Sequence, residues 1–437
     1  MTSPLAYVVS GFPMTTETFI LREVVELTRL GWPIELFSIR HPREPVVHTE
    51  ARWLEPRVHY PGWQAVLAGN LGLLAARPHI WARLLAATIG GTACSPEFLA
   101  KSLAVFPLAL GWARQMQRMG VRHIHAHFGT YPALAALLAA ESQGIGFSFT
   151  VHAHDLYADN VMLAEKVRRA RFVITISEFN HQRLCALVGS ATANRVHVVR
   201  CGVNVHTYDF MPRRPGSGQR SLLSVAALRE YKGLAYLIRA CDLLRAAAPQ
   251  ESFVCRIVGD GPERGALERL IRELRLEGCV RLTGACEQHV VKDLLAEADT
   301  FVLPSVVARN GYMDGIPVAL MEAMASGVPV IASQLSGIPE LVRDRDTGLL
   351  VPPNEAAAIR DAILCCWRQP EAATRRAARA RALVEREYNL ETNTRELARA
   401  FEHELAPEVV RLASSDGLVL RTPAPCHSVG PTPPFGE

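Results

Sequence analysis

Two acids, Asp314 and Glu322, frame the start of a predicted helix. An apolar strand and a polar loop precede them, and the residues at the helix start are Gly315, Ile316, Pro317 and Val318. Proline is tolerated in a first turn because its missing N–H would be unpaired there in any case. The free amides of such a turn favour a phosphate, and a carboxylate about one turn further in can accept hydrogen bonds from a pair of sugar hydroxyls.

A loop and a glycine-rich turn follow the first two predicted strands of the second half of the chain. Arg229 and Lys232 lie in the loop, between a predicted strand and a helix. The next predicted strand, 253–258, ends in a turn that contains Gly259 and Gly261. Glycines permit any tight turn, so this signal gains meaning only from its place between the lysine loop and the acidic helix.

Histidines cluster at the ends of two predicted strands in the first half of the chain. His125 and His127 end one strand, and His152, His154 and Asp155 end or follow the next. These side chains could bind zinc, but ligands two residues apart on one strand give poor geometry unless the second loop meets them. The residues alone therefore favour a role other than zinc binding.

The first predicted strand, 5–9, runs into a loop and then a helix, which is how α/β proteins present ligand loops. This loop contains Gly11, Phe12, Glu17 and Thr18. Thr18 has two interpretations: it caps the following helix, or it belongs to a loop that faces a substrate.

Together these motifs resemble those of the retaining glycosyltransferases of family four, which have the GT-B fold. The sequences GIPVALMEAMASG, from Gly315, and GIPELV, from Gly337, are similar to the family's acidic-x7-acidic signature region and its continuation. The similarity is greatest to bacterial exopolysaccharide enzymes of the colanic-acid type, which also share FPxxTETFI-like and TVHAHD-like segments. The resemblance covers most of residues 5–405.

The resemblance implies an α/β chain with two doubly wound Rossmann-like domains that face a central cleft. A nucleotide-diphosphate sugar would bind the second domain through Arg229, Lys232, Gly259, Gly261, Gly315, Ile316, Pro317, Val318 and Glu322. The residues implied at the reacting centre are His152, Asp155 and Asp314. The loop implied on the acceptor side contains Gly11, Phe12, Glu17 and Thr18.

The sequence departs from the family pattern at two of these places. The first acid is usually Glu and is Asp314 here, a side chain one methylene shorter. The family's GRLxxxKG loop clamps the diphosphate with an Arg and a Lys, but the Arg position is Ala227 here. Arg229 would then provide the guanidinium from a shifted place, beside Lys232. These departures leave a catalytically inactive sugar-nucleotide-binding protein as an alternative.

The activity that the resemblance implies is transfer of a hexose, with retention, to a saccharide or lipid-linked acceptor in exopolysaccharide or cell-envelope synthesis. Lys232 and the helix amides would neutralise the departing diphosphate, so no metal or other cofactor is expected. A nucleotide-sugar epimerase of the same fold is a second alternative. A Rossmann dehydrogenase is disfavoured because no GxGxxG follows the first strand. The DxD sequence at 344–346 indicates a turn rather than a metal site.

Length and composition agree with a globular enzyme of two domains. The chain has 437 residues, nearly half of them apolar, and a formal net charge of +4, which does not indicate a nucleic-acid partner. Ten cysteines without CxxC pairs favour reduced thiols in the cytoplasm. No apolar segment of sufficient length is free of interruption, and we expect neither a signal peptide nor a membrane span.

The expected boundaries follow the motifs and a Pro/Gly-rich linker at 211–218. An acceptor-binding domain is expected over 1–210 and a nucleotide-sugar-binding domain over 219–385. A helix that crosses back to the first domain is expected over 386–412. The last segment, 413–437, is rich in Pro, Gly and Ser and is expected to be a disordered tail.

Residues 63–119 are predicted to form helices broken at Pro78, Pro96 and Pro107. Arginines alternate with Leu, Ala and Trp in this stretch, as they do in helices that lie on anionic lipid. Ordinary covering helices of an α/β domain have much the same composition, and that interpretation is preferred on sequence alone. Peripheral contact with the inner face of the cytoplasmic membrane remains an expectation.

Overall fold

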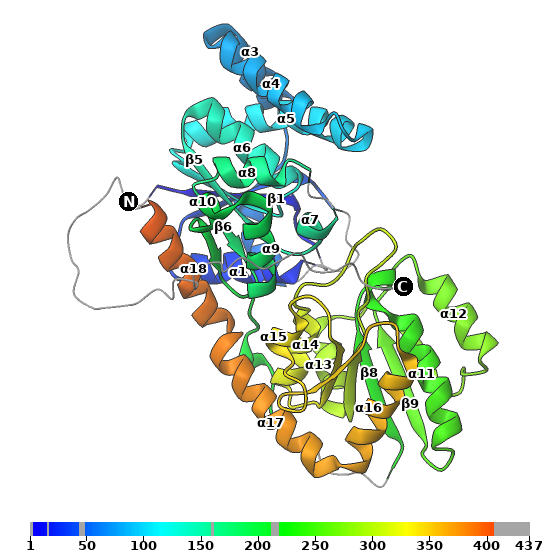
Figure 1. Cartoon of the computed structure of the whole chain (residues 1–437). Helices are drawn as coiled ribbons and strands as arrows, with labels where there is room; N and C mark the ends of the chain where they lie inside the picture. Colours follow the sequence, from blue (N-terminus) through cyan, green and yellow to red (C-terminus); the bar gives the residue numbers. More distant parts are fainter. Residues whose placement is uncertain (1–2, 15–16, 43–48, 159–160, 211–217, 406–437) are drawn as a thin grey trace, which may run out of the picture.

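The chain forms two parallel β-sheets, each covered by helices, in a computed structural model that describes residues 3–14, 17–42, 49–158, 161–210 and 218–405 (Figure 1). The strands of the first sheet are β1 (Leu5–Gly11), β2 (Ile34–Arg40), β3 (Val58–His59), β4 (His123–His127), β5 (Gly146–Val151), β6 (Phe172–Thr175) and β7 (Val196–Val198). The strands of the second are β8 (Arg220–Val225), β9 (Phe253–Val258), β10 (Val280–Gly284), β11 (Thr300–Leu303), β12 (Val330–Ser333) and β13 (Leu349–Val351).

Both sheets are doubly wound. Their strand orders are β3-β2-β1-β4-β5-β6-β7 and β10-β9-β8-β11-β12-β13, and all the pairings between these strands are parallel. The order reverses between β1 and β4 in the first sheet and between β8 and β11 in the second. Ligands of such folds bind beyond the carboxyl ends of the strands at these reversals.

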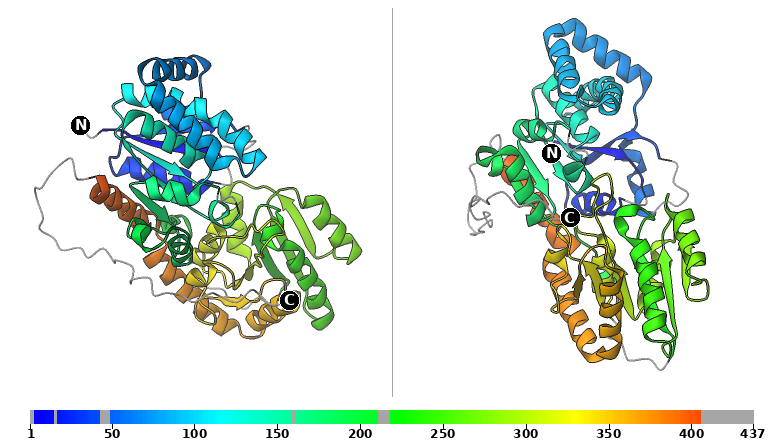
Figure 2. Two further views of the ribbon diagram at one scale, coloured as in Figure 1. Left: turned by 45° about the horizontal axis from the view of Figure 1, so that its top comes forward. Right: turned by 45° about the vertical axis from the view of Figure 1, so that its right-hand side comes forward.

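Helices cover both faces of each sheet (Figure 2). In the first half they are α1 (Thr18–Arg29), α2 (Thr49–Leu54), α3 (Trp63–Ala76), α4 (Pro78–Thr92), α5 (Pro96–Arg118), α6 (Tyr131–Gln143), α7 (His154–Tyr157), α8 (Leu163–Arg169), α9 (Glu178–Val188) and α10 (Ser190–Ala193). In the second they are α11 (Leu234–Ala247), α12 (Arg264–Glu273), α13 (Gln288–Glu297), α14 (Val318–Ala325), α15 (Ile338–Leu341), α16 (Ala356–Arg368), α17 (Pro370–Glu387) and α18 (Leu390–Leu405). Short 3₁₀ turns are Glu55–Arg57, Val205–Thr207 and Glu230–Lys232.

Alternating strands and helices bury one apolar layer on each side of each sheet. The central strands read as nearly continuous apolar runs, as expected for strands buried on both faces. The last helix belongs to the first layer: Leu397, Ala398 and Phe401 of α18 pack with Leu36 and α1. The chain therefore returns to the first sheet after completing the second (Figure 1).

The two passages between the sheets lie side by side. Val203 donates its amide to the carbonyl of Tyr388 at 2.9 Å, and Leu390 donates to the carbonyl of Val203 at 3.0 Å. A Cβ on Gly202 would lie 2.5 Å from the amide nitrogen of Leu390, so glycine permits this close approach.

The stretch 63–119 forms three helices, but the predicted break at Pro107 is wrong. Pro78 and Pro96 do begin α4 and α5, where a missing N–H costs nothing. Pro107 instead lies inside the 23-residue α5. Packing against α3 and α6 along this helix outweighs the local preference of proline, and the side-chain amide of Asn70 binds the Pro107 carbonyl at 2.9 Å.

Several sequence predictions concern residues outside the described ranges. These are all but the last residue of the linker at 211–218, the last part of the crossing helix at 406–412, and the tail at 413–437. In the described part of the chain, no helix combines the length and the apolar character needed to cross a membrane. The DxD sequence lies in a turn, where the Asp344 carboxylate accepts a hydrogen bond from the amide of Leu350.

The contact between α3 and α5 gives a prediction about stability. A Cβ on Gly69 would lie 2.4 Å from the carbonyl oxygen of Leu110, a backbone atom that cannot move aside alone. We expect Gly69→Ala to lower the free energy of unfolding by about 1–3 kcal/mol, measured by urea denaturation. Gly90→Ala is the control, because a Cβ there meets no atom within 4 Å. Equal effects of the two changes would contradict the packing described here.

Candidate functional site

The loops at the two strand-order reversals meet across the domain boundary. His152 follows β5 in the first sheet, and Gly315 precedes α14 in the second. A Cβ on Gly315 would lie 3.1 Å from the main-chain oxygen of His152 and 3.6 Å from the Cβ of Ala153. The rings of His154 and Tyr312 also lie across this boundary, with centroids 5.9 Å apart. The structure thus brings the expected histidine and the expected donor loop together.

Lys232 and Asp314 form an ion pair at this place. The Nζ atom of Lys232 lies 2.5 Å from Oδ1 of Asp314, and the hydroxyl of Ser305 donates to Oδ2 at 2.5 Å. Both side chains are mostly buried, with 14% and 9% of their surfaces exposed. The lysine of the β8 loop and the first acid of the signature therefore form one charged unit.

The glycine turn after β9 lies directly against the lysine loop. A Cβ on Gly259 would lie 1.9 Å from the carbonyl oxygen of Ala226, and one on Gly261 would lie 2.5 Å from that of Leu228. Only glycine allows these two loops to approach so closely. Arg229, in the same loop, is exposed. Its guanidinium is available to a ligand, and no described contact fixes it in the site.

Glu322, one turn into α14, is paired with the first domain. Its carboxylate lies 3.1 Å from the guanidinium of Arg22 on α1, and both side chains are nearly buried. Burial and the neighbouring Glu322 raise the pKa of Tyr208. Ile316 is buried in the core under α14. The helix begins at Val318, so Pro317 occupies the N-cap position and not the first turn in which it was predicted.

Asp155 organises the loop that carries His152. Its carboxylate accepts hydrogen bonds from the amides of Gly129, at 2.7 Å, His152, at 3.1 Å, and Ala153, at 2.9 Å. The side-chain amide of Asn180 donates to the carbonyl of His152 at 2.6 Å. Asp155 is fully buried. Its described hydrogen bonds are with main-chain amides and not with the His152 imidazole.

A chain of hydrogen bonds leads from the His152 imidazole into the first domain. Nε2 of His152 lies 3.0 Å from Nδ1 of His127, and Nε2 of His127 lies 3.0 Å from the carboxylate of Glu23. The hydroxyl of Tyr7 donates to the same carboxylate oxygen at 3.0 Å. Burial, with the nearby His127 and His154, lowers the pKa of His152 well below its ordinary value. His152 is therefore neutral near pH 7.

This chain fixes which nitrogen of each ring holds a proton. An ionised carboxylate only accepts, so we assign the Nε2 proton of His127 to its bond with Glu23. When His127 is neutral, its Nδ1 accepts from Nε2 of His152. The remaining nitrogen of His152, Nδ1, is then a hydrogen-bond acceptor.

The residues considered for zinc are divided between different partners. Among described residues, Glu23, His125 and His127 place ligand atoms within 4.8 Å of one another. The ring nitrogens of His125 are bound to the hydroxyls of Ser148 and Thr150, at 2.8 and 3.0 Å. His154 stacks near Phe128 instead, and Asp155 binds amides. The arrangement fits a hydrogen-bonded network better than a metal centre.

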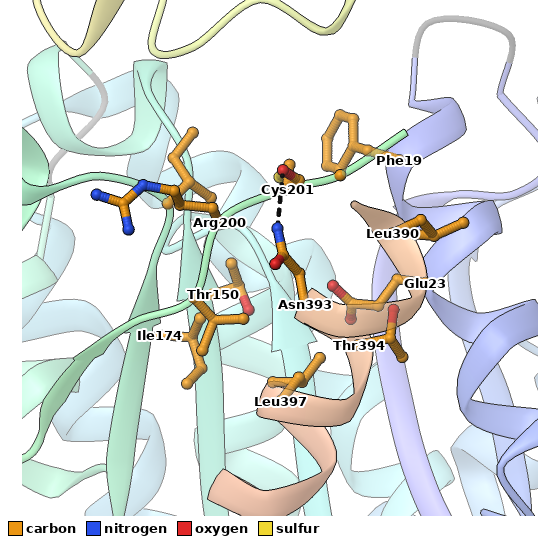
Figure 3. A pocket seen from close by; sticks show the side chains of 13 residues that line it. Phe19, Glu23, Thr150, Ile174, Arg200, Cys201, Leu390, Asn393, Thr394 and Leu397 are labelled. Atoms are coloured by element: carbon orange, nitrogen blue, oxygen red, sulfur yellow. Dashed lines mark hydrogen bonds between the residues drawn. The ribbon is translucent and has the colours of Figure 1, made fainter. Parts of the chain in front are cut away.

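A small pocket lies behind this chain, where α18 begins (Figure 3). Its lining includes the side chains of Phe19, Glu23, Thr150 and Asn393. The side-chain amide of Asn393 reaches the carbonyl of Cys201 at 3.5 Å. Glu23 thus stands between the histidine pair and the place where the chain passes between the domains.

The N-terminal loop connects the strand-order reversal to α1. Gly11 ends β1, and Phe12 is buried, with its carbonyl bound by the hydroxyl of Tyr60 at 2.9 Å. Thr18 is the first residue of α1 and Glu17 holds the N-cap position, so the cap interpretation of Thr18 is wrong by one residue. The next residue, Phe19, places its ring 4.6 Å from that of His152.

Four polar residues in or near the site were not predicted from the sequence. Arg22 and Glu23 lie on α1, one turn beyond the FPxxTETFI segment, and only their tertiary partners reveal them. Lys166 is buried and donates to the carbonyl of Thr130 at 3.3 Å; burial lowers its pKa to about 7. Glu340, within GIPELV, accepts from the amides of Glu178 and Phe179 at the start of α9. Glu340 could have been predicted, because it lies in the GIPELV segment that resembles the family motif.

Comparison with known proteins identifies the family. Residues 16–207 match the family described as Glycosyltransferase Family 4, and residues 210–383 match Glycosyl transferases group 1. The chain is 32% identical over 416 residues to the amylovoran biosynthesis glycosyltransferase AmsK of Erwinia amylovora, covering 91% of this chain and 99% of the relative. The chain belongs to the exopolysaccharide glycosyltransferases of family 4.

Other relatives and solved structures agree with this assignment. The glycosyltransferase is 29% identical to the colanic acid biosynthesis glycosyltransferase WcaL of Escherichia coli K12, over 89% of this chain and 96% of the relative. Anabaena HepE in complex with UDP has a similar fold, with a TM-score of 0.68, 17% identity and coverage of 92% and 100%. Sucrose-phosphate synthase from Thermosynechococcus elongatus has a TM-score of 0.70 at 19% identity, with coverage of 93% and 100%. The GT-B fold predicted from the sequence is confirmed.

The contacts of Asp155 give a prediction about this glycosyltransferase. Asp155→Asn replaces one carboxylate oxygen, an acceptor, with an NH₂ group, a donor. That NH₂ group would then face a main-chain N–H group in a buried position, and neither donor would have an acceptor. We expect the free energy of unfolding to fall by about 1–3 kcal/mol and activity to fall with it, measured by urea denaturation and turnover. Glu402→Gln, at an exposed position of α18, is the control. Unchanged stability of Asp155→Asn would rule out the loop-organising role.

The chain from Glu23 to His152 gives a second prediction. Glu23→Ala removes the acceptor that fixes the tautomer of His127, so His152 can change which nitrogen accepts. We expect kcat to fall by about 10- to 100-fold with little change in KM, and ¹⁵N spectra to show altered imidazole tautomers. Tyr7→Phe keeps the bond between His127 and Glu23 and should have a smaller effect. Identical spectra of Glu23→Ala and the wild type would refute the assignment.

Proposed function

We propose that this glycosyltransferase moves a hexose from a nucleotide-diphosphate sugar to a saccharide or lipid-linked acceptor, with retention and without a metal. The single observation that carries the proposal is the meeting of Lys232, Asp314 and the His152 loop at the strand-order reversals of both sheets. Open α/β sheets bind ligands at these points. The UDP and UDP-glucose complexes of Anabaena HepE support a nucleotide-sugar donor by similarity of fold.

Departure of a nucleoside diphosphate concentrates negative charge on its terminal phosphate. Lys232 and the free amides in the first turn of α14 are the groups of the second domain that can stabilise this charge. Exposed Arg229 would add a guanidinium from the same loop. These groups take the role that a divalent ion has in other transferases, because the same charge develops in both cases.

The other site residues would hold the sugar and the ribose. Glu322 would accept from two ribose hydroxyls after it gives up its ion pair with Arg22. Nδ1 of His152 would accept from a hydroxyl of the hexose, and Asp314 would face the sugar after Lys232 turns to the diphosphate. The departing phosphate itself would take the acceptor proton, so no enzymic nucleophile is required.

The acceptor side of the proposal rests on the first domain. The loop from Gly11 to Thr18 leads from the reversal of the first sheet into α1, whose Phe19 contacts His152. A saccharide held there would approach the hexose from the domain opposite the donor.

We also propose that the enzyme works in the cytoplasm, at the membrane face where lipid-linked acceptors are displayed.

Consumption of nucleotide sugars by defined variants tests this function. The assay uses UDP-, GDP- and ADP-sugars with EDTA present and lipid extract as acceptor. We expect Lys232→Met to lower kcat/KM by about 10²- to 10³-fold, because the negative charge that develops on the departing diphosphate is no longer stabilised by the lysine ammonium. Glu322→Gln should raise KM by about tenfold, because one ribose acceptor becomes a donor. Arg229→Ala measures whether the shifted guanidinium contributes.

Glu277→Ala, at an exposed position of the same domain, is the matched control and should behave as the wild type. Loss of turnover in EDTA would contradict metal independence, and a product of inverted configuration would contradict retention. Binding of a sugar nucleotide without turnover would favour the inactive binding protein instead.

A further inference from the structure

The helix α3 is apolar on every side, although one side faces solvent. Its sequence, WQAVLAGNLGLLAA, contains no charged residue, and its only polar side chains are Gln64 and Asn70. A helix that is hydrophobic all round is normally buried, in a core or in a membrane. Here α3 packs against α5 and α4, and the side turned away from them is exposed. The described structure leaves the other face without an apolar partner.

Four large side chains form a stripe along this open face. Trp63, Leu67, Leu71 and Leu74 follow one another at helical spacing, and 71%, 51%, 62% and 43% of their surfaces are exposed. Single exposed apolar residues are common, but four neighbours along one helix form a continuous apolar surface. We call these four residues the α3 stripe.

The fold holds the α3 stripe rigidly and away from the donor site. A Cβ on Gly69 or on Gly111 would overlap the facing helix, so α3 and α5 pack backbone against backbone. Asn70 fixes the register by donating to the carbonyls of Val66 and Pro107. Helices α3 and α4 form the end of the molecule opposite the second sheet, as both views of Figure 2 show.

The segment that carries the stripe has only positive charges of its own, and one of them, Arg83 on α4, is paired with Glu141 of α6 at 3.5 Å. Between Glu55 and Glu97 the sequence contains no acid, and its charged residues are Arg77, Arg83 and, near the start, Arg57. Arg114 of α5 lies along α3, where its guanidinium donates to the carbonyl of Ala68 at 2.8 Å. Arginines beside an apolar stripe can place their stems on hydrocarbon and their heads at lipid phosphates.

We propose that the α3 stripe is a docking surface for an anionic lipid bilayer. With 14 residues, α3 is too short to cross a bilayer and would lie in the plane of the headgroups. This surface would hold the first domain against the membrane that displays lipid-linked acceptors, and in this respect the inference rests on the proposed function. The nucleotide-sugar site, on the other domain, would remain in water.

The same charges argue against a second copy of the chain as the occupant. In a two-fold symmetric dimer through α3, the acid-free region of one chain would face the acid-free region of the other. Their arginines would then meet like charges instead of carboxylates. An anionic bilayer offers both an apolar layer and the opposite charge.

Sedimentation of the full chain with vesicles tests the proposal. The vesicles are phosphatidylcholine alone or phosphatidylcholine with phosphatidylglycerol, at low and high salt. We expect binding to the anionic vesicles that salt weakens, and a loss of at least about tenfold in the partition coefficient of the double variant Leu67→Gln/Leu71→Gln. Leu187→Gln is the matched control, because Leu187 is a similarly exposed leucine, 43%, on α9.

Each outcome decides the question. Failure of the wild type to bind anionic vesicles, or equal binding by the wild type and the double variant, overturns the proposal. A wild-type dimer that the double variant converts to a monomer, without vesicle binding, assigns the stripe to a second copy. Consumption of the sugar nucleotide in solution by the double variant should equal that of the wild type. Loss of donor consumption by every protein, with vesicle binding intact, would refute the proposed function alone.

Discussion

A buried carboxylate is costly unless it is hydrogen-bonded or paired, and this constraint governs the boundary between the two sheets. Asp155 meets it with three main-chain amides, that of Gly129 after β4 and those of His152 and Ala153 in the His152 loop. Glu340 is only partly buried, and it is bound by two amides at the start of α9 and by the guanidinium of Arg200. Because each acid has partners on another segment, each one fixes a loop as well as satisfying its own charge. The geometry of the site follows from these pairings.

The charged groups that a donor would need are paired with one another in this state. Lys232 is bound to Asp314, and Glu322 is bound to Arg22 of the other domain. A diphosphate that binds Lys232 must share it with Asp314 or displace that carboxylate. Asp314, although one methylene shorter than Glu, therefore still has a role: its carboxylate holds the Lys232 ammonium near the proposed diphosphate site. Pairing of this kind holds both groups in place.

The sequence predicted what depends on local patterns, and it failed where distant segments decide. Alternation of strands and helices and the position of the signature at a helix start are local, so the fold and the placement of Asp314 and Glu322 could be read directly. The partners of Glu322 and Glu23 could not, because Arg22 is 300 residues from Glu322 and His127 is 104 residues from Glu23. Pro107 shows the same limit, since packing of α5 against its neighbours overrides a local helix-breaking preference.

The chain crosses between the two domains twice, and the two crossing segments lie next to each other. Residues Gly202–Val203 and Tyr388–Leu390 pass side by side and are joined by main-chain hydrogen bonds. Adjacent passages leave a narrow hinge, about which the domains can rotate with little change in either core. The contacts that oppose such a rotation are noncovalent: Arg22 with Glu322, Glu340 with the start of α9, and His152 against Gly315. Opening would break these contacts together and free Glu322 for ribose. Donor binding and domain closure would therefore compete for the same carboxylate, which couples one to the other.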